Sequence, residues 1–202
     1  LEFLPESDSA RRLPTLSEMS ATQSNDMRDH EGALRTARLL RDEARKAQDK
    51  LHETIAYREM GWCQGFMGDA RSGLENARRA LTLARSIGNR DQEGWCLNTL
   101  GAIHATHGDH AQAIECFNQA RSIFEAAGEI RGLINVIGNA GLNYLGLGEA
   151  EKATQFLEKG LEISRKHDMS SRYNRGLPNL GMARYETGDV PGAIRVLEEA
   201  LH

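Results

Sequence analysis

The chain has 202 residues, enough for one domain or two small ones, and its 40% hydrophobic and 27% charged residues exclude a disordered acidic chain. No apolar run approaches the roughly 18 residues of a membrane-spanning helix. The net charge of -4 gives no electrostatic reason to expect contact with nucleic acid or an anionic membrane. The three cysteines, Cys63, Cys96 and Cys116, are expected to be small buried hydrophobic residues in a reduced, cytoplasmic setting. Because the sequence starts at Leu1, we expect it to be part of a longer protein.

In chain order, residues 1–13 show no usable periodicity and are predicted to form a flexible tail. A repeat array is predicted to span 14–202. Its first repeat, 14–53, is degenerate, and the part before Met27 is poor in apolar residues, so we expect that part to be frayed or absent. The remaining repeats are predicted at 54–93, 94–133, 134–173 and 174–202, the last of them clipped.

The array is indicated by residues that recur every 40 positions. A glycine followed by an acidic residue stands at Gly68, Gly108, Gly148 and Gly188. Further columns of small residues keep the same spacing, namely Gly61, Gly101, Gly141 and Gly181; Gly73, Ala113, Ala153 and Ala193; and Ala80, Ala120, Gly160 and Ala200. Several coincident columns of this depth are very rare by chance, so the repetition reflects structure.

Each repeat is predicted to be two helices joined by short turns. Apolar residues recur with helical spacing from Asp109 to Ala127 and again from Arg131 to Leu147. Asp109 can cap a helix and Gly128 can end one. Glycine in the middle of a helix costs about 1 kcal/mol relative to alanine, so its repetition indicates that a neighbouring helix passes close to the backbone.

These columns resemble the tetratricopeptide repeat (TPR). The best match is Leu100 and Gly101 followed by Ala113, Phe117 and Ala120. The usual period of this repeat is about 34 residues, and a longer period resembles the subset found in kinesin light chains, spindle-orientation adaptors, Rap-type regulators and bacterial regulatory arrays. The resemblance implies an all-α fold, a right-handed α-solenoid superhelix of stacked antiparallel helix pairs.

In this family the first helices of the pairs line a concave groove that binds peptides. Carried over position by position, the ligand-facing residues are Arg58, Trp62, Trp95, Asn98, Asn135, Asn139, Leu142, Arg175, Asn179, Met182 and Tyr185. Amides can pair with a peptide backbone, and large aromatic side chains offer contact area at low entropic cost. The resemblance thus implies a non-enzymatic protein- or peptide-binding module, the sensory or regulatory part of a longer protein, which binds an extended or helical peptide.

Other interpretations of these residues stay open. Trp62 and Trp95 can instead fill gaps between neighbouring repeats, and asparagines are common on solvated helix faces. The residue set with which chaperone adaptors of this family grip a terminal carboxylate is missing, because Trp62, Ala102, Leu142 and Met182 stand where an asparagine is needed. Recognition of chaperone tails is therefore not predicted.

Catalysis has little support in the sequence. The paired acid and base or activated nucleophile of an enzyme is not seen. His104, His107 and His110 could approach one another at a helix end, but packed or solvated histidines are the more frequent outcome. We predict no catalytic residue, no metal, no cofactor, and no direct binding of nucleic acid or membrane.

Self-association is the alternative hypothesis. Ile194, Leu197 and Leu201 lie on the apolar face of the clipped last repeat, which could pair with a second copy of the chain. The chain would then be a scaffold that forms a homodimer through its C-terminal repeat.

Overall fold

The computed structural model contains ten helices and no strand within the residues it describes, 9–25 and 29–200. Side chains are described for 12–24, 29–169 and 176–200. The chain divides into two compact units, residues 1–107 (unit 1) and 108–202 (unit 2). None of the described helices combines the length and the apolar character that crossing a membrane requires.

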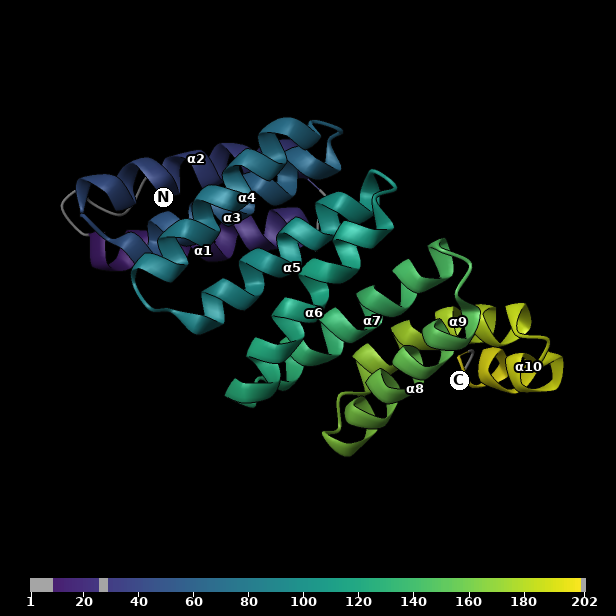
Figure 1. Ribbon diagram of the computed structural model, residues 1–202. Helices are drawn as coiled ribbons and strands as arrows, with labels where there is room; N and C mark the ends of the chain where they lie inside the picture. Colours follow the sequence, from purple (N-terminus) through teal and green to yellow (C-terminus); the bar gives the residue numbers. More distant parts are fainter. Residues whose placement is uncertain (1–8, 26–28, 201–202) are drawn as a thin grey trace. The chain divides into compact units, whose positions relative to one another are not determined.

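Each unit is built only of helices in its described part (Figure 1). Unit 1 holds α1 (Ser9–Asn25), α2 (His30–Lys46), α3 (Lys50–Phe66), α4 (Ala70–Ser86) and α5 (Arg90–Thr106). Unit 2 holds α6 (His110–Ala127), α7 (Ile130–Gly146), α8 (Ala150–Lys166), α9 (Ser170–Glu186) and α10 (Val190–Glu199). The predicted all-α helical repeat fold is confirmed.

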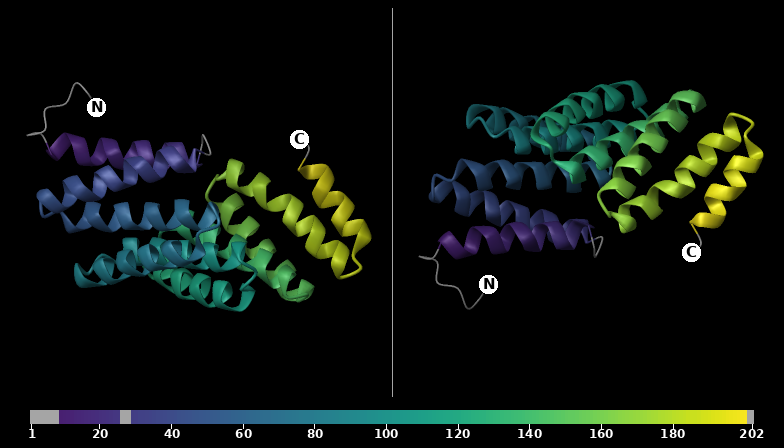
Figure 2. Two further views of the ribbon diagram at one scale, coloured as in Figure 1. Left: turned by 90° about the horizontal axis from the view of Figure 1, so that it is seen from above. Right: turned by 90° about the horizontal axis from the view of Figure 1, so that it is seen from below.

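Consecutive helices within each unit lie side by side and run in opposite directions (Figures 1 and 2). In unit 1, α1 also contacts α3 and α3 contacts α5, and in unit 2, α7 contacts α9. The first helices of successive pairs therefore touch one another, as stacked helix pairs require. The right-handed superhelical course stays a prediction.

The mid-helix glycines lie where the partner helix of the pair comes close, through its backbone at Gly61 and through a side chain at Gly141. A Cβ atom built on Gly61 of α3 would lie 2.9 Å from both the nitrogen of Ala77 and the oxygen of Gly73 on α4. On α7, a Cβ on Gly141 would lie 2.8 Å from Cγ of Leu157 on α8. The inference that a neighbouring helix passes close to these glycines is confirmed.

The helix at the N-terminus corrects one predicted boundary. α1 begins at Ser9, inside the segment predicted to be a tail, and contains the half-repeat that was expected to be frayed. Leu13 is 3% exposed and Leu16 is fully buried, in a cluster with Leu40 of α2. This apolar burial explains why residues 9–13 are helical and moves the start of the array ahead of residue 14.

The predicted repeat boundaries fall inside the first helix of each pair. These helices begin at Lys50, Arg90, Ile130 and Ser170, whereas the predicted boundaries are 54, 94, 134 and 174. Caps mark the observed starts: Asp49 accepts a hydrogen bond from the backbone N–H of His52 at 3.0 Å, and Asn89 does the same for Gln92.

Left-handed residues end the helices at intervals of 20 residues, half the repeat length. Positive φ angles of 65° to 91° occur at Gly68, Gly88, Gly108, Gly128, Gly148 and Gly188. Gln48 and Asp168 occupy two further places in this series, with φ angles of 57° and 54°. Five of these eight turns were recognised from the sequence, and those at Gln48, Gly88 and Asp168 were not.

Replacing Gln48 with glycine should raise the free energy of unfolding by about 1 kcal/mol, because the left-handed conformation costs an L-residue about that much. Gly68→Ala, at an equivalent turn, should lower it by a similar amount. An added Cβ there meets no atom within 4 Å, so only backbone strain contributes. Urea unfolding measures both changes, and two variants as stable as the parent would contradict a role for left-handed backbone in these turns.

Candidate functional site

The predicted ligand-facing residues lie on four helices. Unit 1 places Arg58 and Trp62 on α3, and Trp95 and Asn98 on α5. Unit 2 places Asn135, Asn139 and Leu142 on α7, and Arg175, Asn179, Met182 and Tyr185 on α9. The side chain of Arg175 lies outside the described residues.

The two predicted residues of α3 are engaged with neighbours on the same helix. Nη2 of Arg58 donates to a carboxylate oxygen of Glu59 at 2.9 Å. The ring of Trp62 lies against that of Phe66, with centroids 4.5 Å apart. Within the described residues, Nε1 of Trp62 and Nε of Arg58 are buried without a hydrogen-bond partner. Both interpretations of Trp62, gap filler and ligand contact, stay open.

The two predicted residues of α5 differ in accessibility. Asn98 is only 6% exposed. Trp95 is half-buried, as are Asn135, Asn139 and Asn179 of unit 2. Burial therefore makes Asn98 a weaker candidate than the asparagines of unit 2, but it does not separate Trp95 from them.

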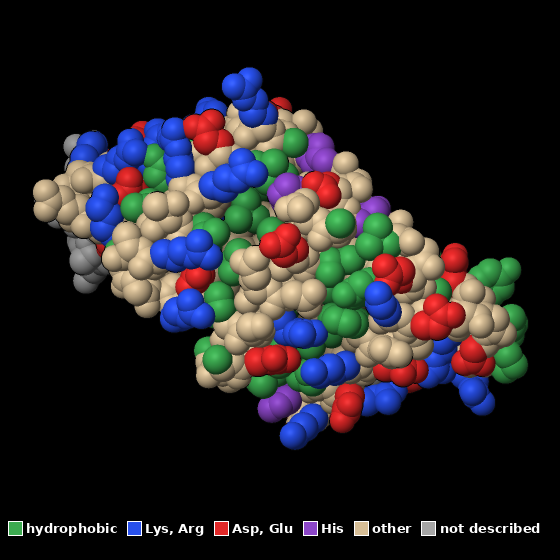
Figure 3. Space-filling view, in the orientation of Figure 1, with side chains coloured by type: hydrophobic (Ala, Val, Ile, Leu, Met, Phe, Trp, Pro, Cys, Tyr) green, Lys and Arg blue, Asp and Glu red, His purple; other side chains and the backbone are tan. Residues whose placement is uncertain are grey.

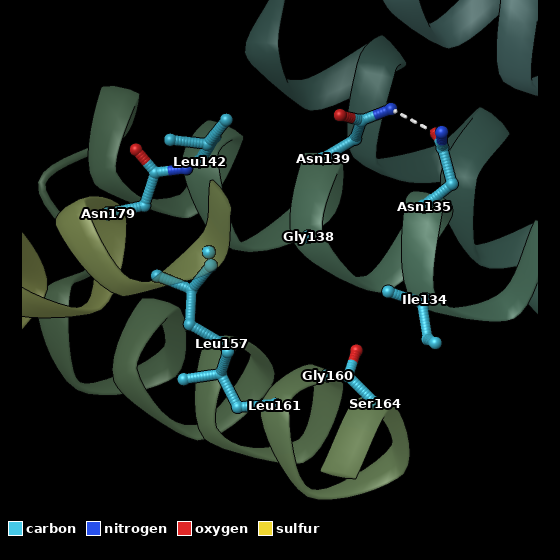
Figure 4. A pocket seen from close by; sticks show the side chains of 11 residues that line it. Ile134, Asn135, Gly138, Asn139, Leu142, Leu157, Gly160, Leu161, Ser164 and Asn179 are labelled. Atoms are coloured by element: carbon cyan, nitrogen blue, oxygen red, sulfur yellow. Dashed lines mark hydrogen bonds between the residues drawn. The ribbon is translucent and has the colours of Figure 1, made fainter. Parts of the chain in front are cut away.

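Unit 2 brings four of the predicted residues together around one pocket. Asn135, Asn139 and Leu142 of α7 and Asn179 of α9 line a cavity of about 210 Å³. Nδ2 of Asn139 donates to Oδ1 of Asn135 at 2.9 Å, and Figure 4 shows the pair at the edge of the cavity. The other lining residues are Ile134, Gly138, Leu157, Gly160, Leu161, Ser164 and Gly176.

A buried amide supports this pocket from one turn further along α7. Nδ2 of Asn143 donates to the carbonyl oxygen of Asn139 at 2.8 Å, and Oδ1 of Asn143 lies 2.9 Å from Nδ1 of His110 on α6. Asn143 is 5% exposed. Since buried polar groups are costly to leave unpaired, the contact with His110 ties α7 to α6.

Two tetratricopeptide repeat family models match the chain, one over residues 54–126 and one over 134–167, which together make up more than half of it. The chain belongs to the tetratricopeptide repeat family. Stacked helix pairs with small residues at their crossings agree with this assignment. The pocket between α7, α8 and α9 agrees with it as well.

Solved structures share the TPR fold at low identity. A signal transduction ATPase with a TPR sensor from Pyrococcus horikoshii has a TM-score of 0.75 and 19% identity, over 98% of this chain and 30% of its own. A Rap protein complexed with Competence and Sporulation Factor has a TM-score of 0.82 and 10% identity, over 94% of this chain and 53% of its own. A putative kinesin light chain with nearly identical TPR-like repeats, from Podospora anserina, has a TM-score of 0.71 and 14% identity, over 94% of this chain and 93% of its own.

These likenesses show the fold alone. The TPR chain spans less than two thirds of the length of the first two proteins. A TPR array is a scaffold for protein interaction, and that role holds for this chain at the level of the family.

The sequence analysis missed the side of the pocket that α8 supplies, because it searched only the first helix of each pair. Ser164 and Leu161 are the clearest examples. Conversely, Met182 and Tyr185 do not line the pocket; they are 55% and 66% exposed on α9. The signal in the sequence is a glycine at a position where the preceding repeats have larger residues. Gly160 of α8 and Gly176 of α9 are two such positions.

Unit 1 has a wider cavity, of about 700 Å³, beside the arginines of α2 and α4. Lys and Arg side chains gather over these helices (Figure 3). Arg45 pairs with Glu53 at 2.9 Å and Arg79 with Glu75 at 2.6 Å. Burial opposes the ionisation of Glu53, but hydrogen bonds from Lys50 and Arg45 outweigh it and keep its pKa below the usual value. Internal ion pairs thus neutralise much of this charge.

Two of the three cysteines lie in the core. Burial raises the pKa of Cys63 to about 11 and that of Cys96 to about 12, so both thiols are protonated at neutral pH. Cys116 is only half-buried, which differs from the expectation that it lies in the core. Within the described part of the chain, no three His, Cys, Asp or Glu residues are placed to hold a metal ion.

Proposed function

We propose that this TPR chain is a non-enzymatic peptide-binding module, the sensory or regulatory part of a longer protein. It binds an extended or helical segment of a partner along the first helices of its repeats. The observation that carries the proposal is the pocket of unit 2, where asparagines of α7 and α9 meet an apolar wall. The residues predicted on the first helices of unit 1 form a separate candidate surface.

The asparagines suit contact with a peptide backbone. Each amide offers two N–H donors and one acceptor oxygen, so it can serve both the C=O and the N–H of a peptide unit. The bond between Asn139 and Asn135 uses one donor and one acceptor and sets the orientation of both groups. Such contacts hold a segment without reading its sequence, and an exposed apolar residue such as Leu142, at 39% exposure, adds contact area.

Two of the structural neighbours support a regulatory role. One is a TPR sensor within a signal transduction ATPase, and the other is a Rap protein complexed with Competence and Sporulation Factor. In both, the part that this chain matches belongs to a longer protein.

The double variant Asn135→Ala/Asn179→Ala should lower the affinity for a selected peptide about tenfold, because each lost hydrogen bond is worth about 0.5–1.5 kcal/mol. Peptides selected from a random linear library on the parent protein serve as the probe, and isothermal titration calorimetry measures the affinity. Circular dichroism checks that the variant keeps its helix content.

The matched control is Gln119→Ala/Gln155→Ala. It removes two exposed amides of α6 and α8 that do not line the pocket. It should bind as tightly as the parent. If Asn135→Ala/Asn179→Ala also bound as tightly as the parent, the assignment of these asparagines to the binding surface would be contradicted. If the parent selected no peptide, the proposed function would be contradicted.

Self-association stays the alternative, and exposed apolar side chains at the C-terminal helices favour it. Ile194 of α10 is 52% exposed and Leu197 is 43% exposed, beside Met182 of α9 at 55%. Leu201 lies outside the described residues. If these residues form a dimer, light scattering over a dilution series should give twice the monomer mass, and Ile194→Lys should return it to the monomer. A parent that is monomeric throughout would exclude this dimer.

A further inference from the structure

The unit 2 pocket has open space beside Gly138 of α7, where preceding repeats carry larger side chains. Residues 40 positions apart occupy equivalent places in successive repeats. Gly176 of α9 stands where those repeats have Val136, Cys96 and Ala56, which are all fully buried. The same comparison sets Gly138 against Asn98 and Arg58, and Gly160 against Ala120 and Ala80. At Gly176 and Gly160 a neighbour already occupies the space, because a Cβ atom would lie 3.1 Å from Cδ2 of Leu161 and 3.3 Å from Cγ2 of Ile137. A Cβ atom on Gly138 would meet no atom within 4 Å, so the space beside it is empty of protein.

Ser164 is the polar exception in an apolar column. The preceding repeats have Phe124, Ala84 and Ala44 at this place, all 0% exposed. Ser164 is 1% exposed, and among the described residues its hydroxyl has no hydrogen-bond partner. Figure 4 shows that hydroxyl pointing from α8 into the pocket. An unpaired buried hydroxyl is unfavourable and alanine fits the column, so packing alone does not account for a serine here.

The size and the walls of the pocket limit what can enter it. A cavity of about 150 Å³ holds a benzene ring, so about 210 Å³ admits an aromatic ring with one added group. Ile134, Leu157 and Leu161 form apolar walls. None of the lining residues, all within the described part of the chain, carries a charge. A charged side chain that entered the pocket would therefore lose its hydration without gaining a counter-charge.

We infer that this pocket selects a tyrosine side chain of the bound segment. The ring lies between the apolar walls and its hydroxyl pairs with Oγ of Ser164, because a phenol can both donate to and accept from a serine. A phenylalanine ring would fill the space but leave Ser164 unpaired. The inference rests on the proposed function, since Asn135 and Asn139 hold the backbone of the same segment at the edge of the pocket.

The test is a selection from a random linear-peptide phage library on the parent protein and on Gly138→Leu. The parent should enrich peptides that share a tyrosine. Gly138→Leu places a side chain in the empty space and should no longer enrich tyrosine, although peptides held by the remaining surface can still be recovered. Circular dichroism melting shows whether the variant is folded.

A double-mutant cycle isolates the contact between the two hydroxyl groups. Ser164→Ala should weaken a selected tyrosine peptide about three- to tenfold, the equivalent of one hydrogen bond. It should leave the same peptide with phenylalanine unchanged. Because alanine occupies this column at Ala44 and Ala84, Ser164→Ala should fold at least as stably as the parent. Ser122→Ala, an exposed serine of α6 outside the pocket, is the control and should change neither peptide.

The outcomes separate this inference from the proposed function. Three results would overturn the pocket inference alone. The selected peptides could lack a common tyrosine, tyrosine enrichment could survive Gly138→Leu, or Ser164 and the phenol could show no coupling. A parent that enriches no peptide would overturn both. Tyrosine enrichment together with coupling supports both.

Discussion

Direct contact between the backbones of paired helices is the constraint on which the rest of the fold depends. A Cβ atom on Gly73 of α4 would lie 2.8 Å from the nitrogen of Gly65 and 3.0 Å from the oxygen of Gly61, both on α3. Backbone atoms cannot move aside as the end of a side chain can. Glycine is therefore a steric requirement of the crossing between α3 and α4.

The same residue type has the opposite effect where no neighbour fills the space. Gly138 lies on a first helix like Gly61, but nothing approaches the position its Cβ would take. It borders the hollow between α7, α8 and α9, and Ser164 supplies one polar group at the wall of that hollow. Open space in a repeat can thus result where glycine replaces a larger side chain and no neighbour takes its place.

The repeat fold could be predicted from the sequence because the crossings leave glycine and alanine at fixed intervals. Five of the eight turns were recognised; Gly88 lies outside the 40-residue glycine column, and Gln48 and Asp168 take the left-handed conformation without being glycine. The helix from Ser9 was missed because its burial depends on Leu13 meeting α2, a contact that periodicity does not show. Asn135, Asn139, Leu142 and Asn179 were predicted as one surface and line one pocket, whereas Ser164 was not predicted, because its role depends on what the neighbouring helices lack.

Comparing the unfolding free energies of Gly73→Ala and Gly138→Ala tests the central claim most directly. Alanine favours a helix by about 1 kcal/mol over glycine at either position, so any difference between the variants comes from the surroundings. The account predicts that Gly138→Ala raises the free energy of unfolding by about that amount. Gly73→Ala should lower it by about 1–3 kcal/mol because the added methyl group meets backbone. An equal increase in both variants would contradict the claim that backbone contact holds the helix pairs together.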